Sequence, residues 1–87
     1  MRHLALPRFW RCYRRLPAKV RRLADKNYEM LTADPHHPSL HFKKIGGTKH
    51  LGSVRVGEHY RALGVEKPDS LVWFWIGTHA EYDGLLS

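Results

Sequence analysis

Basic side chains stand at alternate positions of short apolar segments in the second half of the chain. Lys43, Arg55 and Arg61 occupy such positions in three consecutive segments, and Lys44 and Lys49 lie nearby. If these segments are neighbouring strands, they lie about 4.8 Å apart, so the side chains converge on one target. Guanidinium and ammonium groups both suit a phosphodiester, which makes phosphate binding the favoured interpretation. The alternative is a solvated sheet face that serves only solubility.

His79 is the residue best placed for proton transfer. It closely follows an apolar run, which puts it at the rim of the core, and an imidazole titrates near neutral pH. Tyr82 lies one helical turn further on, so the two side chains share one side of a short helix. Asp83 or Glu81 could orient the imidazole, or serve as a cap or an ion pair. The alternative to catalysis is a capping or packing role for His79 itself.

Other histidines invite a metal-binding interpretation. His36, His37 and His41 lie close together in the sequence, but no cysteine accompanies them, and prolines flank the pair His36-His37 on both sides. Because the prolines predict an irregular loop, no His-x-x-x-His pair is expected on a helix. We therefore predict neither a metal site nor a cofactor. Cys12 is the only cysteine of the sequence, so no disulfide framework is expected.

The strand that would position His79 is the apolar run Leu71–Ile76. It is too short for a typical helix and is rich in β-branched and aromatic residues, which predicts a strand buried on both faces. Gly77 ends the run. Thr78, with Glu81 three residues later, forms a capping-box pattern, so we predict a short C-terminal helix that begins near Thr78.

Two of the tryptophans lie within this run. Trp73 and Trp75 are two residues apart, so we predict that they share one face of the strand and belong to the core. Whether their face or that of Phe74 is turned toward the site stays open.

Two helices are predicted before the strands. Segment 8–16 is amphipathic, and a second helix covers about residues 17–33. Leu16-Pro17 is the only joint between them, which predicts an antiparallel hairpin. Residues His3–Leu6 fit either an edge strand or a lead-in. The apolar face of the first helix consists of Phe9, Cys12, Tyr13 and Leu16.

Four short strands, at 40–45, 51–56, 59–65 and 71–76, complete the prediction, with turns at Gly46-Gly47, Gly57-Glu58 and 66–69. Helices segregated from such a meander predict a single α+β domain over residues 1–87. Its two N-terminal helices pack on an antiparallel four-stranded sheet, and a short C-terminal helix follows. The helices should cover one sheet face. The other face should carry His41, Lys43, Ser53, Arg55, His59 and Arg61.

Charge narrows the class of partner. Fifteen Lys and Arg residues face eight Asp and Glu residues, which gives a net charge of +7. A small domain this basic usually meets nucleic acid, an anionic surface or an acidic protein. Hydrophobic residues make up 43% of the chain, which argues for a folded domain. No apolar stretch approaches a membrane span or a signal peptide, so we expect no membrane partner and a cytoplasmic location.

Several of these segments together resemble the RelE/ParE superfamily of type II toxin–antitoxin toxins. The resemblance covers about Phe9 to Leu86, and the ending Gly77-Thr78-His79 is similar to that of the RelE/YafQ-like branch. It implies a compact α+β toxin with a mostly antiparallel sheet. The matching segments are Leu16-Pro17, Asp34-Pro35 followed by Leu40-His-Phe-Lys, Ser53-Val-Arg-Val with Tyr60-Arg-Ala-Leu, and Trp75-Ile-Gly-Thr-His-Ala-Glu-Tyr-Asp.

The RelE-like branch implies a metal-independent endoribonuclease that cleaves mRNA in the ribosomal A site and so inhibits translation. The ribose 2′-hydroxyl attacks the adjacent phosphate, which leaves a cyclic phosphate and a free 5′-hydroxyl. The implied catalytic residues are His79, Arg61, Arg55 and Tyr82. The residues implied to bind RNA phosphates are Lys43, Lys44, Lys49, His41 and His59.

Two other functions stay open. A ParE-like inhibitor of DNA gyrase would share the fold without ribonuclease chemistry, and a basic accessory or degenerate toxin would have no activity. Either toxin implies a cognate antitoxin, which we expect to be an acidic, partly disordered segment that folds across the basic surface.

Overall fold

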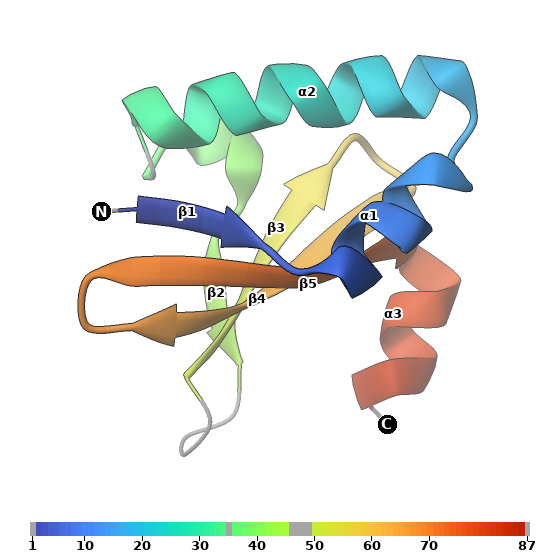
Figure 1. Ribbon diagram of the computed structural model, residues 1–87. Helices are drawn as coiled ribbons and strands as arrows, with labels where there is room; N and C mark the ends of the chain where they lie inside the picture. The colour runs from blue at the N-terminus through green and yellow to red at the C-terminus, as the bar shows by residue number, and fades with distance from the viewer. Residues whose placement is uncertain (1, 35, 46–49, 87) are drawn as a thin grey trace.

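The computed structural model of the chain describes residues 2–34, 36–45 and 50–86. A strand, β1 (Arg2–Ala5), leads into the helices α1 (Pro7–Arg14) and α2 (Ala18–Ala33). A 3₁₀ turn, η1 (Pro38–Leu40), precedes four strands and the last helix (Figure 1). These are β2 (Lys43–Ile45), β3 (Leu51–Val56), β4 (Tyr60–Lys67), β5 (Ser70–Thr78) and α3 (His79–Leu86). Within the described residues, no helix is long and apolar enough to cross a membrane.

The sheet has five strands in the order β1-β5-β4-β3-β2, so the predicted four-stranded antiparallel sheet was wrong. Strands β2 to β5 are antiparallel neighbours, but β1 pairs with β5 in parallel, with His3 opposite Leu71. Bonds from Arg2 N to Asp69 O and from Leu6 N to Trp73 O extend the pairing at both ends. The structure thus decides for the edge strand between the two alternatives left open at His3–Leu6. Four residues are too few for a clear alternation, and their partner lies far along the chain, so the sequence could not decide between them.

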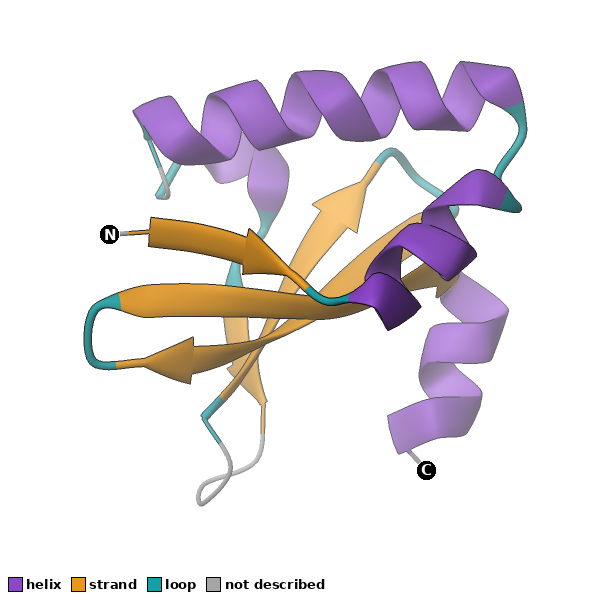
Figure 2. Cartoon of the chain, in the orientation of Figure 1, coloured by secondary structure: helices purple, strands orange, loops and turns teal. Residues whose placement is uncertain are grey.

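Prolines set the limits of the helical hairpin. Pro7 lies in the first turn of α1, where its missing N–H costs no hydrogen bond, and Pro17 directly precedes α2. The buried core joins this hairpin to one face of the sheet, here called the core face. Figure 2 shows α2 along one side of the strands and α3 away from it. The core consists of Leu16, Leu31, Leu40, Val54, Val56, Ala62, Leu71, Trp73 and Ile76.

The segment predicted as a strand over 40–45 is mostly not a strand. Leu40 is fully buried at the end of η1, and His41 then takes a left-handed conformation with φ 47°. Only Lys43–Ile45 forms β2. The chain needs this kink because Leu40 must enter the core before the strand can reach the edge of the sheet. The predicted Gly46-Gly47 turn lies outside the described residues.

A β-bulge places the two strand tryptophans on opposite faces, which corrects the prediction that they share one. Leu63 pairs with Trp75 whereas the next residue, Gly64, pairs with Trp73, so Phe74 is an extra residue in β5. Trp73 joins the core, and its indole lies over Gly64, where a Cβ would come within 2.8 Å of Cε3. The sequence periodicity of two could not show this extra residue.

The other sheet face, here called the second face, is only partly open. Ser53 lies on it, as predicted from alternation, but it is 3% exposed rather than solvated. Its register partner is Leu63, which in turn pairs with Trp75, and both are buried. Two large apolar side chains beside the serine exclude water from the middle of this face. The charged positions are thereby confined to its margins.

Candidate active site

Two arginines lie opposite each other on the second face. Arg55 of β3 and Arg61 of β4 are register partners, and both are half-buried. Both donate to the carbonyl of Gly57 in the intervening turn: Arg55 Nε at 3.1 Å and Arg61 Nη1 at 3.4 Å. Arg61 Nη1 also donates to Tyr60 O at 2.7 Å. The sequence thus places two positive charges side by side, and the turn backbone holds them in place.

This pair retains hydrogen-bonding capacity. A guanidinium carries five N–H donors, and these bonds use Nε of one arginine and Nη1 of the other. His41, just before β2, extends the row, with its Nε2 3.5 Å from Arg55 Nη1. Within the described part of the chain neither arginine has a carboxylate partner. Two adjacent guanidinium groups without an acid favour a bound anion.

His79 stands at the first position of α3, and a complete capping box fixes it there. Glu81 N donates to Thr78 Oγ1 at 3.1 Å, and Thr78 N donates to Glu81 Oε1 at 3.0 Å. These bonds from the Thr78 backbone and side chain lower the pKa of the Glu81 carboxyl. The backbone N–H of His79 also donates to His59 O at 2.7 Å. The start of α3 is therefore tied to the β3–β4 turn.

The His79 imidazole is oriented by Asp83, one turn along the helix. Nδ1 lies 3.1 Å from Asp83 Oδ2, and the His79 side chain is 48% exposed. A carboxylate at Nδ1 holds the proton there, so Nε2 is the nitrogen free to accept one. The ring of Tyr82 lies 6.0 Å from that of His79. The structure thus separates the two acids: Asp83 orients the histidine and Glu81 caps the helix.

A shallow depression of about 400 Å³ lies beside His79, and neither arginine of the pair is among its lining residues. It is lined by His59, Tyr60, Thr78, His79, Ala80 and Asp83. Arg61 directly follows Tyr60 and is the register partner of Gly77, two residues before His79. The arginine pair and the imidazole therefore lie at the same end of β4 and β5, although no hydrogen bond joins them among the described residues.

The residues predicted to bind phosphate are not all gathered here. Lys43 is exposed on the second face, as the partner of buried Ser53. Lys44 points the other way and pairs with Glu66, at 3.2 Å between Nζ and Oε1. His59 is exposed and its Nε2 lies 3.9 Å from a Glu58 carboxylate oxygen. Lys49 lies outside the described residues.

Sequence reasoning missed two parts of this site. Gly57, with φ +67°, supplies the carbonyl that holds both arginines, and Tyr60 lines the depression. The signal for the first was the Gly-Glu turn between two arginine-bearing strands, since a glycine there permits the left-handed conformation. A Cβ on Gly57 would also meet Leu23 of α2 at 2.6 Å.

Two other features of the described structure, the histidines near η1 and a larger cavity, offer neither a metal site nor a polar pocket. Among the described residues, no group of three or more His, Cys, Asp or Glu side chains could hold a metal ion. His37 Nδ1 instead accepts a bond from Ser39 N. A larger cavity of about 630 Å³ lies between α1, α2, β1 and the core face. Its walls are mainly apolar and aromatic, so it has the character of a gap in the core.

Comparisons with known proteins agree on the fold. A family model described as the ParE-like toxin domain matches residues 18–84. RelE in the RelB-RelE antitoxin-toxin complex from Methanococcus jannaschii has a TM-score of 0.77 at 18% identity, covering 97% of this chain and 99% of that one. YafQ from E. coli strain BL21(DE3) has a TM-score of 0.71 at 14% identity, covering 94% and 98%.

A third structure, the YoeB/ParE toxin from Agrobacterium tumefaciens, has a TM-score of 0.69 at 14% identity, covering 91% of this chain and 99% of that one. No curated protein sequence matches the chain. At such identities the three structures establish a shared fold.

Proposed function

The chain belongs to the ParE-like toxin family within the RelE/ParE superfamily, and we propose that it is a ribosome-dependent mRNA endoribonuclease that needs no metal, which its likeness to the RelE and YafQ structures supports. As the toxin of a toxin–antitoxin system, it would act in the cytoplasm to inhibit translation. The observation that carries the proposal is the arginine pair, Arg55 and Arg61, at the same end of β4 and β5 as an imidazole whose Nδ1 is held by a carboxylate.

The proposed reaction is transesterification within the RNA chain. His79 Nε2 accepts the proton of the ribose 2′-hydroxyl, whose oxygen attacks the adjacent phosphorus. The bond from phosphorus to the 5′ oxygen breaks, and that oxygen takes up a proton as it leaves. We assign the two proton transfers to His79 and Tyr82. The products are a 2′,3′-cyclic phosphate and a free 5′-hydroxyl.

The arginine pair stabilises the crowded phosphate. Negative charge builds up on its non-bridging oxygens as the 2′ oxygen approaches, and preorganised donors stabilise that charge without reorganisation. The Gly57 carbonyl orients both guanidinium groups before the substrate arrives. Lys43, His41 and His59 would contact neighbouring phosphates from the margin of the second face.

A cognate antitoxin is the proposed partner. The M. jannaschii relative was solved as a RelB-RelE antitoxin-toxin complex, and a relative from Pyrococcus horikoshii as a RelE-RelB complex. The partner should be acidic, because it would fold across the second face, where Arg55 and Arg61 have no carboxylate partner among the described residues.

Primer extension on an mRNA translated in a bacterial extract tests the proposal. We expect codon-linked cuts with the wild-type protein. His79→Ala should lower the cleavage rate by about 10² to 10⁴-fold, the usual contribution of an acid–base group. Arg61→Lys keeps the positive charge but loses the two parallel N–H donors of the guanidinium, and should lower the cleavage rate by about tenfold or more. His36→Ala is the matched control, because His36 is exposed and outside the depression.

Full cleavage by both site variants, with folding checked by circular dichroism, would remove these residues from the mechanism. Inhibition of DNA gyrase is the second candidate function, favoured by the ParE-like description of the matching family. Absence of cuts in the extract, together with trapped gyrase–DNA cleavage complexes, would establish that function instead.

A further inference from the structure

The net positive charge of the protein is concentrated away from the candidate active site. Residues 7–26 hold eight of the fifteen Lys and Arg residues and one of the eight acidic residues. This segment, the first three quarters of the helical hairpin, therefore carries +7, which equals the net charge of the whole chain. The remaining residues, which include the arginine pair and His79, balance to zero.

These cations are mostly exposed and only lightly compensated: the charge of Arg15 contributes to lowering the pKa of the Glu81 carboxyl. The eight are Arg8, Arg11, Arg14, Arg15, Lys19, Arg21, Arg22 and Lys26, and all but the half-buried Arg21 are exposed. Among the described residues, none of them forms an ion pair with a carboxylate. Such crowding of like charges destabilises the free protein, so an anionic partner would relieve it.

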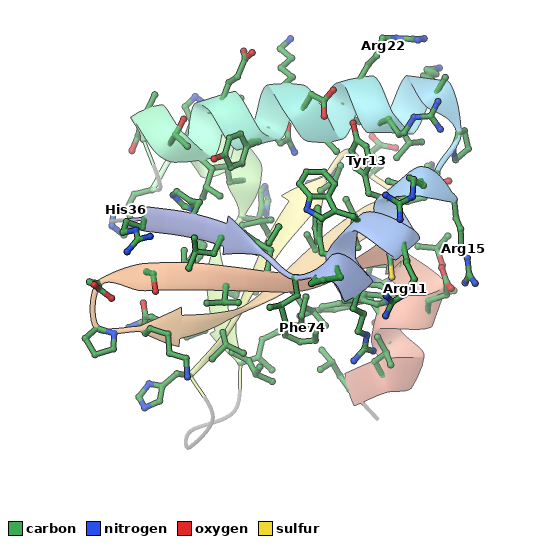
Figure 3. The ribbon with its side chains drawn as sticks, viewed as in Figure 1. Arg11, Tyr13, Arg15, Arg22, His36 and Phe74 are labelled. Carbon is green, nitrogen blue, oxygen red and sulfur yellow. The ribbon has the colours of Figure 1, made fainter. Side chains whose placement is uncertain are left out.

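The hairpin presents the cations as two stripes. Arg8, Arg11 and Arg15 follow the spacing i, i+3, i+7 along α1 and its C-cap, and Lys19, Arg22 and Lys26 repeat it on α2. Each stripe spans about 10 Å at the rise of an α-helix. Figure 3 shows Arg22 on the outer side of α2, and Arg11 and Arg15 along α1 on the side away from α2.

From this arrangement we infer that the helical hairpin is a second binding surface, which contacts the sugar–phosphate backbone of structured RNA. Six of the eight cations are arginines, whose fork matches phosphate and which stay charged. Exposed ion pairs with a folded acidic protein contribute little each. A nucleic acid, in contrast, releases a condensed counterion for each phosphate that is neutralised. This favours RNA over an acidic protein face.

The inference goes beyond the proposed nuclease, and it would explain how such a nuclease holds the ribosome. A messenger RNA in the decoding site lies within a large surface of folded RNA. The hairpin would bind that surface while the arginine pair and His79 act on the message. The surface reads no sequence, since phosphate contacts position a protein without specifying bases.

Fluorescence anisotropy with a mixed-sequence RNA duplex of about 20 base pairs tests the surface on the full-length protein. The hairpin variant combines Arg8→Gln, Arg11→Gln, Lys19→Gln and Arg22→Gln. Its control combines Arg2→Gln, Lys44→Gln and Lys67→Gln, which removes three positive charges from residues outside the hairpin and outside the candidate active site. Glutamine is a good helix former, so the helices of the hairpin variant should fold.

We expect the hairpin variant to bind at least about tenfold more weakly, with a log–log salt slope shallower by about 3 to 4. The control should keep its slope within about one of the wild-type value. Equal losses in both variants would overturn the inference, because the charge would then act diffusely. So would a poly-glutamate peptide that displaces the duplex at equal charge concentration, since this would identify an acidic protein as the partner.

Ribosome-dependent cleavage gives an independent measurement. The hairpin variant should raise KM for programmed ribosomes and leave kcat unchanged, because none of its four residues lies in the depression. An unchanged KM would contradict the inference. Duplex binding by a wild-type protein that cuts no mRNA would instead refute the nuclease proposal and leave the hairpin surface standing.

Discussion

Gly77 is the position where the smallest change should disturb both stability and the site. A Cβ built there lies 2.5 Å from Cζ2 and 3.1 Å from Cη2 of Trp75, and 3.0 Å from Glu81 Oε1. The glutamate can rotate away, but the indole is rigid and only 6% exposed. Gly77→Ala therefore forces the ring of Trp75 or the backbone at the start of α3 to move.

We expect this substitution to cost about 2 kcal/mol, within the usual range for overpacking. For a domain of this size that lowers the Tm by roughly 8 to 16 °C. Disturbed capping would also displace His79, so cleavage should fall at temperatures where the variant is still folded. Differential scanning calorimetry measures the first effect and primer extension the second.

Gly84→Ala is the matched control. Gly84 lies inside α3, and a Cβ there meets nothing within 4 Å. An alanine should stabilise the helix by about 1 kcal/mol, because glycine loses more backbone entropy on folding. The Tm should then rise by roughly 4 to 8 °C. If both alanine variants shift the Tm in the same direction, or Gly77→Ala leaves it unchanged, the packing argument for Gly77 fails.

The cap of α3, the His3–Trp73 contact and the contact between the first two helices can each be tested by one substitution. Thr78→Val removes the hydroxyl of the capping box and should lower the free energy of unfolding by about 1 kcal/mol. Because the pKa of Glu81 is held below its ordinary 4.5, the wild-type protein should lose this stabilisation as the pH falls below that value. Urea unfolding at acidic pH should therefore show a smaller loss of stability for the variant than for the wild type. Trp73 Nε1 donates to His3 Nδ1 at 3.3 Å, and burial lowers the pKa of His3 from 6.5, so the free energy of unfolding should fall as the pH drops below 6.5. His3→Asn should make the free energy of unfolding depend less on pH in this range. An unchanged pH dependence would show that His3 does not cause it. Tyr13→Phe removes the 2.7 Å hydrogen bond to Asp25 Oδ1 and should lower the free energy of unfolding by about 0.5 to 1 kcal/mol. An unchanged midpoint of urea unfolding would show that this bond between α1 and α2 is not formed in solution.

Predictions were confirmed where the two residues that form an interaction lie close together in the sequence. The capping box needs only Thr78 and Glu81, and the structure has every bond that it requires. Both helices of the hairpin begin where a proline predicted, since Pro7 lies in the first turn of α1 and Pro17 directly precedes α2. The opposition of Arg55 and Arg61 followed from a short turn between alternating strands.

Predictions that needed distant partners were less accurate. The parallel pairing of β1 with β5 depends on contacts between the two ends of the chain. The bulge at Phe74 depends on how β5 meets β4, and it moved Trp75 to the second face. Lys44 was assigned to phosphate, yet strand alternation turned it toward Glu66.

The sequence by itself determined the two N-terminal helices, the strands β3, β4 and β5, the cap of α3 and the place of the net charge. Each of these depends on residue type, spacing over a few positions or simple counting. Only the tertiary structure decided which acid orients His79, which carbonyl holds the two arginines and which side of the sheet stays accessible. Those choices depend on the twist and register of five strands, and register is a property of pairs of segments that no single segment encodes.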